Sequence, residues 1–127
     1  MITDDKFPPL GDIRGLKIYH NPRCRKSREG LEILENSGKK FEIIKYLEDV
    51  PTEKELAEII NLLGIKPLEL VRKNEQIWKD NFKTKNLTDK EIIKAMVQHP
   101  KLIERPIVVK NNKAVIGRPT ENIIELL

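Results

Sequence analysis

The sequence predicts an α/β domain in which helices cover a four-stranded mixed β-sheet and a helical block is inserted between the second and third strands. Residues 16–45 show a strand, a helix and a strand, a pattern typical of two parallel strands joined by a right-handed crossover. Residues 106–117 show a β-hairpin, and a short helix follows. The residues between carry the 3.6-residue periodicity of amphipathic helices.

The composition fits a single domain that folds without a disulfide or metal. The chain has 127 residues and is 39% hydrophobic, too apolar for a disordered chain. A net charge of +4 suits an anionic small molecule at least as well as a polyanion. One cysteine excludes an internal disulfide, and with only two histidines most metal sites are excluded, so we expect no metal or bound cofactor.

The sequence also limits where the protein can act and which partners it can bind. No apolar run approaches the ~18 residues of a membrane span, and no signal peptide is visible, so we expect a cytoplasmic monomer without membrane contact. Aromatic residues at 5% and the lack of a known motif argue against nucleic-acid binding. We expect residues 1–15 to be a disordered tail or a cloning remnant, and residues 16–127 to form the domain.

The first three elements follow from short local signals. Residues 16–19 are a strand, and His20-Asn21-Pro22 breaks it with a turn. A helix is expected from Cys24 to about Asn36, with Gly38 as its C-cap. A second strand is expected over 41–45.

The inserted helical block is expected at about 49–103. Thr52 to Glu55 fits a capping box before an apolar stripe, and Gly64 ends that helix. Residues 67–73 predict a short helix, whereas the polar stretch 74–86 gives no clear signal. Thr88 to Glu91 is a second capping box, and its helix ends at Pro100.

The hairpin is the clearest element. Two β-branched runs over 106–110 and 113–117 flank Asn111-Asn112, and asparagine tolerates the positive φ of a two-residue turn. A short helix over 119–127 closes the chain.

Cys24 is the first candidate for chemistry because it opens a helix after a strand and a turn. A thiolate there is stabilised by the positive end of the helix. The window 13–28 contains no acidic residue but several arginines and lysines. The alternative is an inert buried cysteine, since free cysteines are usually buried.

Three neighbours and three distant arginines are further candidates. Ser27 occupies the second position of a Cys-x-x-Cys spacing, where it could donate a hydrogen bond to the thiolate or only cap the helix. His20 is either a partner of the sulfur or a turn residue. Arginine suits bidentate oxyanion recognition, although a lone arginine is usually a solvated surface charge. The arginines in question are Arg72, Arg105 and Arg118, with Arg28 nearer to the cysteine.

Several separated motifs resemble the glutaredoxin-dependent arsenate reductase family. The first is residues 19–28, Tyr-His-Asn-Pro-Arg-Cys-Arg-Lys-Ser-Arg. The others follow in order as Tyr46-Leu47, Leu70-Val71-Arg72-Lys73-Asn74, His99-Pro100, Glu104-Arg105-Pro106-Ile107-Val108-Val109 and Ile116-Gly117-Arg118-Pro119. The resemblance covers residues 16–127. One departure is Arg25-Lys26, where better-characterised reductases place Gly-Thr.

The resemblance implies a thioredoxin-like fold and an oxyanion-reducing thiol enzyme. Cys24 would be the nucleophile, with His20 and Ser27 holding it as thiolate, and Pro106 would be a cis-proline. Arg72, Arg105 and Arg118 would bind the oxyanion, and Arg28 is a further candidate. The thiolate would attack arsenate, glutathione would attack the adduct, and glutaredoxin would reduce the mixed species so that arsenite leaves.

Two other functions remain open from the sequence. One is a glutathione-linked thiol oxidoreductase that does not act on arsenate. The other is an Spx-type transcription regulator that binds RNA polymerase, although such proteins usually carry a Cys-x-x-Cys switch that Ser27 breaks. A different arsenate reductase type needs Cys-x5-Arg, and Gly30 excludes it.

Overall fold

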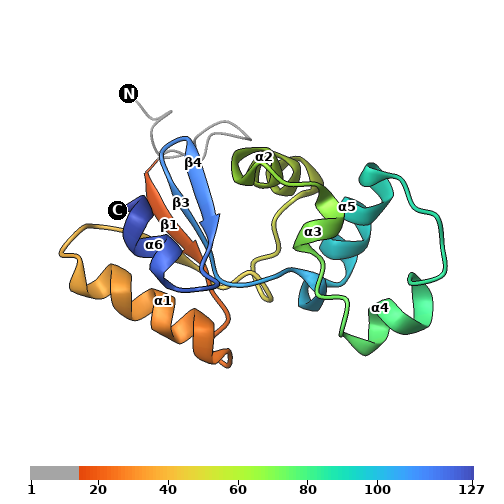
Figure 1. The fold of residues 1–127 in the computed structure, drawn as a ribbon, viewed down its shortest axis with the longest axis horizontal. Helices are drawn as coiled ribbons and strands as arrows, with labels where there is room; N and C mark the ends of the chain where they lie inside the picture. The colour runs from red at the N-terminus through yellow and green to blue at the C-terminus, as the bar shows by residue number, and fades with distance from the viewer. Residues whose placement is uncertain (1–14) are drawn as a thin grey trace.

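The computed structural model describes residues 15–127 and places the elements in the predicted β-α-β, helices, β-β-α order (Figure 1). The elements are β1 (Leu16–Tyr19), α1 (Arg25–Asn36), β2 (Glu42–Ile44), α2 (Glu53–Leu63), α3 (Pro67–Leu70), α4 (Gln76–Asn81), α5 (Asp89–Gln98), a 3-10 turn η2 (Pro100–Leu102), β3 (Ile107–Lys110), β4 (Lys113–Ile116) and α6 (Glu121–Leu126).

The four strands form one mixed sheet in the order β2-β1-β3-β4. Strands β1 and β2 are parallel, whereas β1 pairs antiparallel with β3 and β3 pairs antiparallel with β4. The predicted mixed sheet, its parallel pair and its hairpin are therefore confirmed, and so is the thioredoxin-like fold class.

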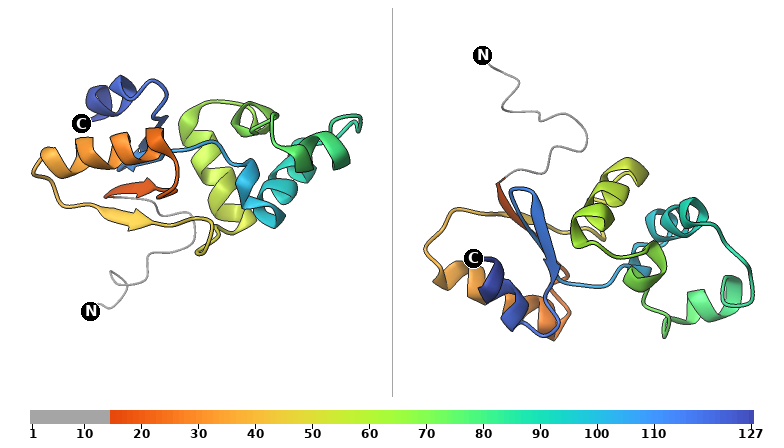
Figure 2. Two further views of the ribbon diagram at one scale, coloured as in Figure 1. Left: turned by 90° about the horizontal axis from the view of Figure 1, so that it is seen from below. Right: turned by 45° about the horizontal axis from the view of Figure 1, so that its top comes forward.

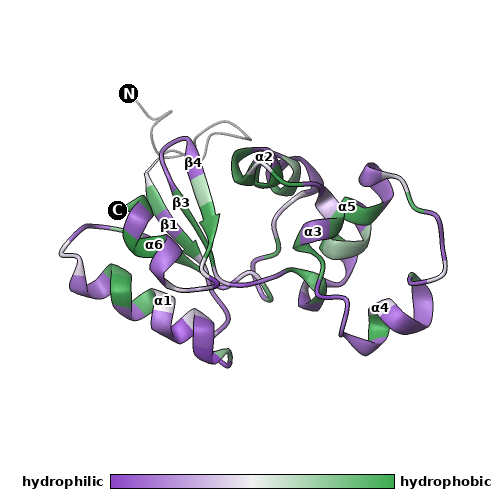
Figure 3. Ribbon diagram, in the orientation of Figure 1, coloured by the Kyte–Doolittle hydropathy of each residue, from purple (hydrophilic) through white to green (hydrophobic). Residues whose placement is uncertain are grey.

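Both faces of the sheet are covered (Figure 2). Helices α1 and α6 lie on one face, where Ile18, Leu34, Val108 and Ile123 form a buried cluster. The inserted helices pack against the other face through a larger cluster. Its members include Tyr19, Leu56, Ile59, Met96, Ile107 and Val109. Strand residues alternate between these clusters, as the period of a pleated strand requires. The hydropathy follows the layers, because the strands are largely apolar whereas the first turn of α1 is hydrophilic (Figure 3).

One of the two predicted capping boxes is complete. Thr88 accepts from the Glu91 amide, and Glu91 accepts from the Thr88 amide in return. Thr52 accepts from the Glu55 amide at 3.0 Å, but the Glu55 carboxylate accepts instead from the Tyr19 hydroxyl at 2.7 Å. A contact across the fold therefore takes the carboxylate that the sequence pattern assigned to the cap.

The predicted helix over 67–73 was too long. It ends at Leu70, because Val71 forms a β-bridge with Ile103 and the Arg72 amide donates to the Leu102 carbonyl at 2.7 Å. The undecided stretch 74–86 contains α4, which is anchored by the buried Trp78.

Other boundaries also differ, among them the start and the C-cap of α1 and the start of the last helix. Cys24 is the N-cap of α1 rather than its first residue, and the C-cap is Ser37, with Gly38 following at a φ of +75°. The closing helix begins at Glu121 rather than at 119.

Gly15 belongs to the fold, although the sequence placed it in the tail. Its amide donates to the Asn111 side chain at 3.3 Å, and its carbonyl accepts from the Asn111 amide at 2.8 Å. Asn111 has the positive φ expected at the hairpin turn, 56°. The rest of the predicted tail, residues 1–14, lies outside the described residues.

Both arginine-proline peptides, Arg105–Pro106 and Arg118–Pro119, are cis. The resemblance implied the first and not the second. Across residues 15–127, no helix has the length and apolar character needed to span a bilayer. The same residues hold no group of three or more side chains suited to a metal ion.

Gly117 is packed too closely for a side chain, which gives a test of the core beside β3. A Cβ there would lie 2.7 Å from Ile123 Cδ1 and 2.8 Å from Pro106 Cγ. We expect Gly117→Ala to lower the free energy of unfolding by about 1–3 kcal/mol in urea denaturation, because the core cannot expand freely. Ile123→Val removes the clashing Cδ1. It should destabilise the wild type by about 0.5–1.5 kcal/mol and the G117A protein by clearly less. Additive effects of the two substitutions would contradict this packing.

Candidate active site

Cys24 stands at the start of α1, in the turn that connects β1 to this helix. It is the N-cap residue with extended backbone angles (φ −97°, ψ 124°), and its amide donates to the Asn21 carbonyl at 3.0 Å. The amides of the first helical turn have no partner within the helix, so they present positive partial charge to the sulfur. The residue retains 8% of its surface exposed.

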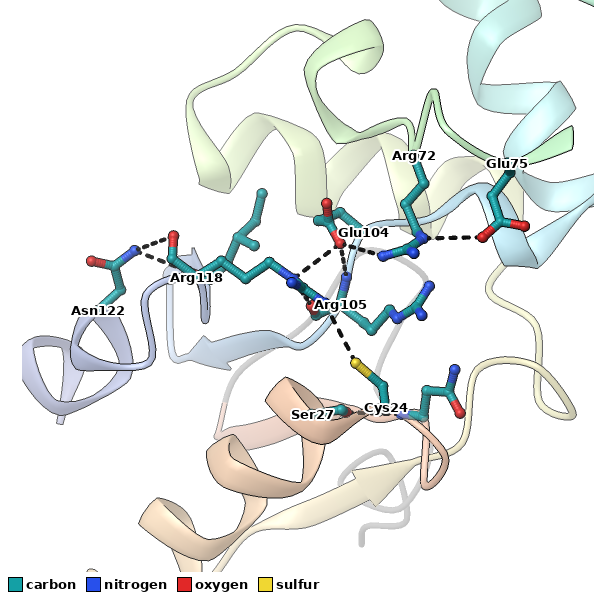
Figure 4. A network of polar contacts seen from close by, with 10 residues as sticks. Cys24, Ser27, Arg72, Glu75, Glu104, Arg105, Arg118 and Asn122 are labelled. Carbon is teal, nitrogen blue, oxygen red and sulfur yellow. Dashed lines mark hydrogen bonds and ion pairs between the residues drawn. The ribbon is translucent and has the colours of Figure 1, made fainter. Parts of the chain in front are cut away.

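A guanidinium points at the sulfur (Figure 4). Arg118 Nη2 lies 3.4 Å from Cys24 Sγ. Burial opposes ionisation of the thiol, but the effects of the Arg105 guanidinium, the Ser27 backbone amide and the charge of Arg118 outweigh it, so the Cys24 pKa is lowered. The pKa of Arg105 is raised in turn, because the interaction with Cys24 outweighs the effect of its own burial. These opposite directions are those of an ion pair.

The fold gathers the three predicted arginines at this site. Arg118 donates through Nε to the Arg105 carbonyl at 2.8 Å, which links the end of β4 to the start of β3. Arg72 reaches the same place from the residues after α3 and donates to Glu104 at 3.0 Å. Beside them lies a polar groove of about 370 Å³, lined by Val71, Arg72, Lys73, Asn74, Glu104 and Arg118.

His20 and Ser27 contact each other rather than placing their side chains on the sulfur. His20 Nδ1 lies 2.7 Å from Ser27 Oγ, and Ser27 Oγ also accepts from the Asn21 amide at 2.9 Å. Both residues are buried, and burial lowers the pKa of His20, so the neutral ring is favoured. The part of Ser27 that lowers the Cys24 pKa is its backbone amide, whereas the hydroxyl contacts the Asn21 amide and His20. Ser27 does not cap the helix either, because its hydroxyl secures the turn before it.

Arg28 is exposed and donates to the Pro22 carbonyl at 3.1 Å. Its guanidinium thus braces the turn before α1. A role for Arg28 in oxyanion binding stays a prediction.

Tyr46 and Glu104 are site residues to which the sequence assigned no role. The Tyr46 side chain is 1% exposed, and its hydroxyl has no hydrogen-bond partner among the described residues. Burial raises the Tyr46 pKa to about 12, and the charges that act on it belong to Arg105, Cys24, Arg72 and Glu104. Its position gave a usable signal, because Tyr46 follows β2, and parallel strands β1 and β2 end at the same edge.

Comparisons with known proteins agree with this geometry. The model of the ArsC family matches residues 19–126. The chain belongs to the ArsC family.

Several relatives are similar over nearly their whole length. The arsenate reductase of Escherichia coli strain K12 is 42% identical over 116 residues, covering 91% of this chain and 82% of the relative. The uncharacterized protein YfgD of the same organism is 45% identical over 114 residues, covering 88% and 96%. The solved structure of an arsenate reductase from Vibrio cholerae is 45% identical and superposes with a TM-score of 0.85, covering 90% of this chain and 98% of that chain.

The Arg25-Lys26 pair of this ArsC-family chain points outward. Arg25 Nε lies 3.2 Å from Glu29 Oε2, and Lys26 Nζ lies 3.5 Å from Glu29 Oε1. Both side chains are exposed. The departure from Gly-Thr therefore changes the rim of the site and not the donors on the sulfur.

A first prediction for the site concerns Arg118. Because the thiolate is the reactive form, the alkylation rate of Cys24 should reach half its plateau below the ordinary thiol value of about 8.5. Arg118→Ala removes a donor and a positive charge, so the midpoint should move up by about one pH unit. Iodoacetamide alkylation across pH measures both. An unchanged midpoint in R118A would show that the 3.4 Å contact does not stabilise the thiolate.

A second prediction tests whether the Ser27 hydroxyl stabilises the turn rather than the Cys24 thiolate. Ser27→Ala should lower the free energy of unfolding by about 1–3 kcal/mol, because the Asn21 amide and His20 Nδ1 lose their buried partner. The Cys24 alkylation midpoint should stay close to that of the wild type, since the amide at position 27 remains. A large upward shift of that midpoint without a loss of stability would restore the hydroxyl-to-thiolate role.

Proposed function

We propose that this protein reduces arsenate to arsenite, with Cys24 as the nucleophile and Arg72, Arg105 and Arg118 as the oxyanion-binding residues. The observation that carries the proposal is a pair of buried donors without partners, on two residues whose electrostatic interactions include Cys24. Within residues 15–127, Tyr46 Oη and Arg105 Nε are the buried side-chain polar atoms that lack a hydrogen-bond partner. Unsatisfied buried donors are costly, and an oxyanion supplies the acceptors that both require.

The charges favour the same substrate class. A thiolate and an arsenate dianion repel each other, so their approach needs positive charge on both. The arginine cluster supplies that charge at a site where the guanidiniums are already oriented. The Tyr46 hydroxyl stays protonated at neutral pH because its pKa is about 12, so it acts as a donor.

The chemistry balances with two external thiols. The Cys24 thiolate forms a sulfur–arsenic bond, and an arsenate oxygen leaves as water after it gains protons. Glutathione displaces a second oxygen, again as water. A thiol of glutaredoxin then attacks the glutathione sulfur and forms a disulfide, while the electron pair of the broken sulfur–arsenic bond reduces As(V) to As(III). Water releases arsenite and regenerates the Cys24 thiol.

The single cysteine of the chain makes external thiols necessary, since no second thiol is present to resolve the adduct. We propose glutathione and glutaredoxin as these partners. We also propose a cytoplasmic location, where both thiols are kept reduced.

Arsenate-dependent turnover tests the proposal directly. In a coupled assay with glutathione, glutaredoxin, glutathione reductase and NADPH, NADPH oxidation should require arsenate and be lost in Cys24→Ser. Arsenite formation, measured separately, should match the NADPH consumed. Activity on glutathione mixed disulfides that ignores arsenate would instead favour a glutathione-linked thiol oxidoreductase.

Tyr46→Phe distinguishes an oxyanion donor from a structural tyrosine. Removing an unpartnered buried hydroxyl should leave the free energy of unfolding unchanged or raise it slightly. The kcat/KM for arsenate should fall by about 10-fold or more, because a hydrogen bond to a charged oxygen is lost. Urea denaturation and the coupled assay measure the two quantities. Wild-type kcat/KM in Y46F would exclude Tyr46 from the site.

A further inference from the structure

Glu104 joins the arginines of the site through a single oxygen atom. Its Oε1 accepts from Arg72 Nη1 at 3.0 Å and from the Arg105 backbone amide at 3.1 Å, and it lies 3.2 Å from Arg118 Nε (Figure 4). Arg72 and Arg118 come from separate parts of the fold, one from the helical block and one from the end of the sheet. This carboxylate is therefore the shared contact between them.

The backbone fixes where this carboxylate stands. The Glu104 amide donates to the Leu70 carbonyl at 2.9 Å, and the Arg72 amide donates to the Leu102 carbonyl at 2.7 Å. These bonds flank the bridge between Val71 and Ile103. Glu104 is thus held opposite Leu70 and Arg72 opposite Leu102, so the two charged residues are diagonal neighbours on two short paired segments. The Glu104 side chain is 26% exposed, so its ion pairs are partly shielded from solvent.

The contacts also determine which way the Arg118 guanidinium faces. Its Nε is held by the Arg105 carbonyl and Glu104, and this leaves Nη2 directed at Cys24 Sγ. In Arg72, Nε lies 3.4 Å from Glu75 and Nη1 is bonded to Glu104. Each guanidinium carries five N–H groups in a rigid plane, so both retain donors for a ligand.

We propose that Glu104 is a positioning residue. It orients Arg118 toward the sulfur and holds Arg72 near Arg118, so that the donors are in place before the oxyanion binds. Its negative charge also offsets the repulsion between the guanidiniums. The substrate part rests on the proposed function. The effect on the sulfur does not, because it concerns the resting enzyme.

Two substitutions at position 104 separate position from charge. Glu104→Gln keeps an oxygen that accepts hydrogen bonds but removes the negative charge, so the alkylation midpoint of Cys24 should fall slightly. Glu104→Ala removes both, so Arg118 loses its orientation and the midpoint should lie about half to one pH unit above that of E104Q. If Glu104 acted only as a charge, or if it had no influence on the sulfur, the two variants would share one midpoint and the proposal would be overturned.

Glu75 provides a matched control. It pairs with Arg72 at 3.4 Å and is about as exposed as Glu104, at 29%. Because its ion pair is with Arg72 and not with Arg118, E75Q and E75A should give the same Cys24 midpoint as each other. Urea denaturation of all four variants confirms that a folded protein is being titrated.

Enzymatic turnover gives a second measurement that is separate from the Cys24 alkylation midpoint. With arsenate, glutathione and glutaredoxin, E104A should lose about 10-fold or more in kcat/KM, and E104Q should recover most of that loss. Equal losses in E104A and E104Q would contradict a positioning role. If the wild type showed no arsenate turnover, the proposed function would fail while the alkylation comparison would still decide the role of Glu104.

Discussion

The site depends on one interaction, the contact between the Arg118 guanidinium and Cys24 Sγ, which acts with the charge of Arg105 to lower the pKa of the Cys24 thiol. The sheet makes this contact possible. Because β1 and β3 are antiparallel, the end of β1 at Tyr19 lies beside the start of β3 at Ile107, and Ile107 in turn pairs with Ile116 at the end of β4. The segments after β1, before β3 and after β4 therefore meet at one edge. Strand β2 runs parallel to β1 and brings Tyr46 to that edge as well.

Bringing so many cations together has a cost that the helical block offsets. Guanidiniums at close range repel, and burial opposes the charge of Arg105. The inserted segment contributes Arg72 together with Glu75, and the segment that leads back to β3 contributes Glu104. The carboxylates of Glu75 and Glu104 hold the arginines in fixed directions. A negative charge on the Cys24 sulfur balances part of the remaining positive charge. The helical insertion is therefore part of the site. The β-bridge between Val71 and Ile103 holds the residues after α3 against the segment that leads to β3.

Elements with local signals could be predicted from the sequence, and contacts across the fold could not. The hairpin at Asn111, the parallel pair and the helix opening at Cys24 each follow from adjacent residues, and the structure contains them. The predicted helix to Lys73 fails because pairing with residues 102–104 ends it, which no local pattern reveals. The roles of Tyr46 and Glu104 depend on which strand ends meet. The meeting of the arginines was expected only because the motifs resemble a known family.

Ser27 shows why the second thiol has to come from outside the chain. Position 27 is fully buried, and its hydroxyl is bonded to the Asn21 amide while it contacts His20 Nδ1. These contacts hold the turn that delivers Cys24 to the helix start. A sulfur at this position would be a weak acceptor for the Asn21 amide and a weak donor to a buried, neutral histidine. The turn therefore favours serine at position 27, whereas resolution within the chain would need cysteine there. Here the side chain serves the turn, so a second thiol has to come from another molecule.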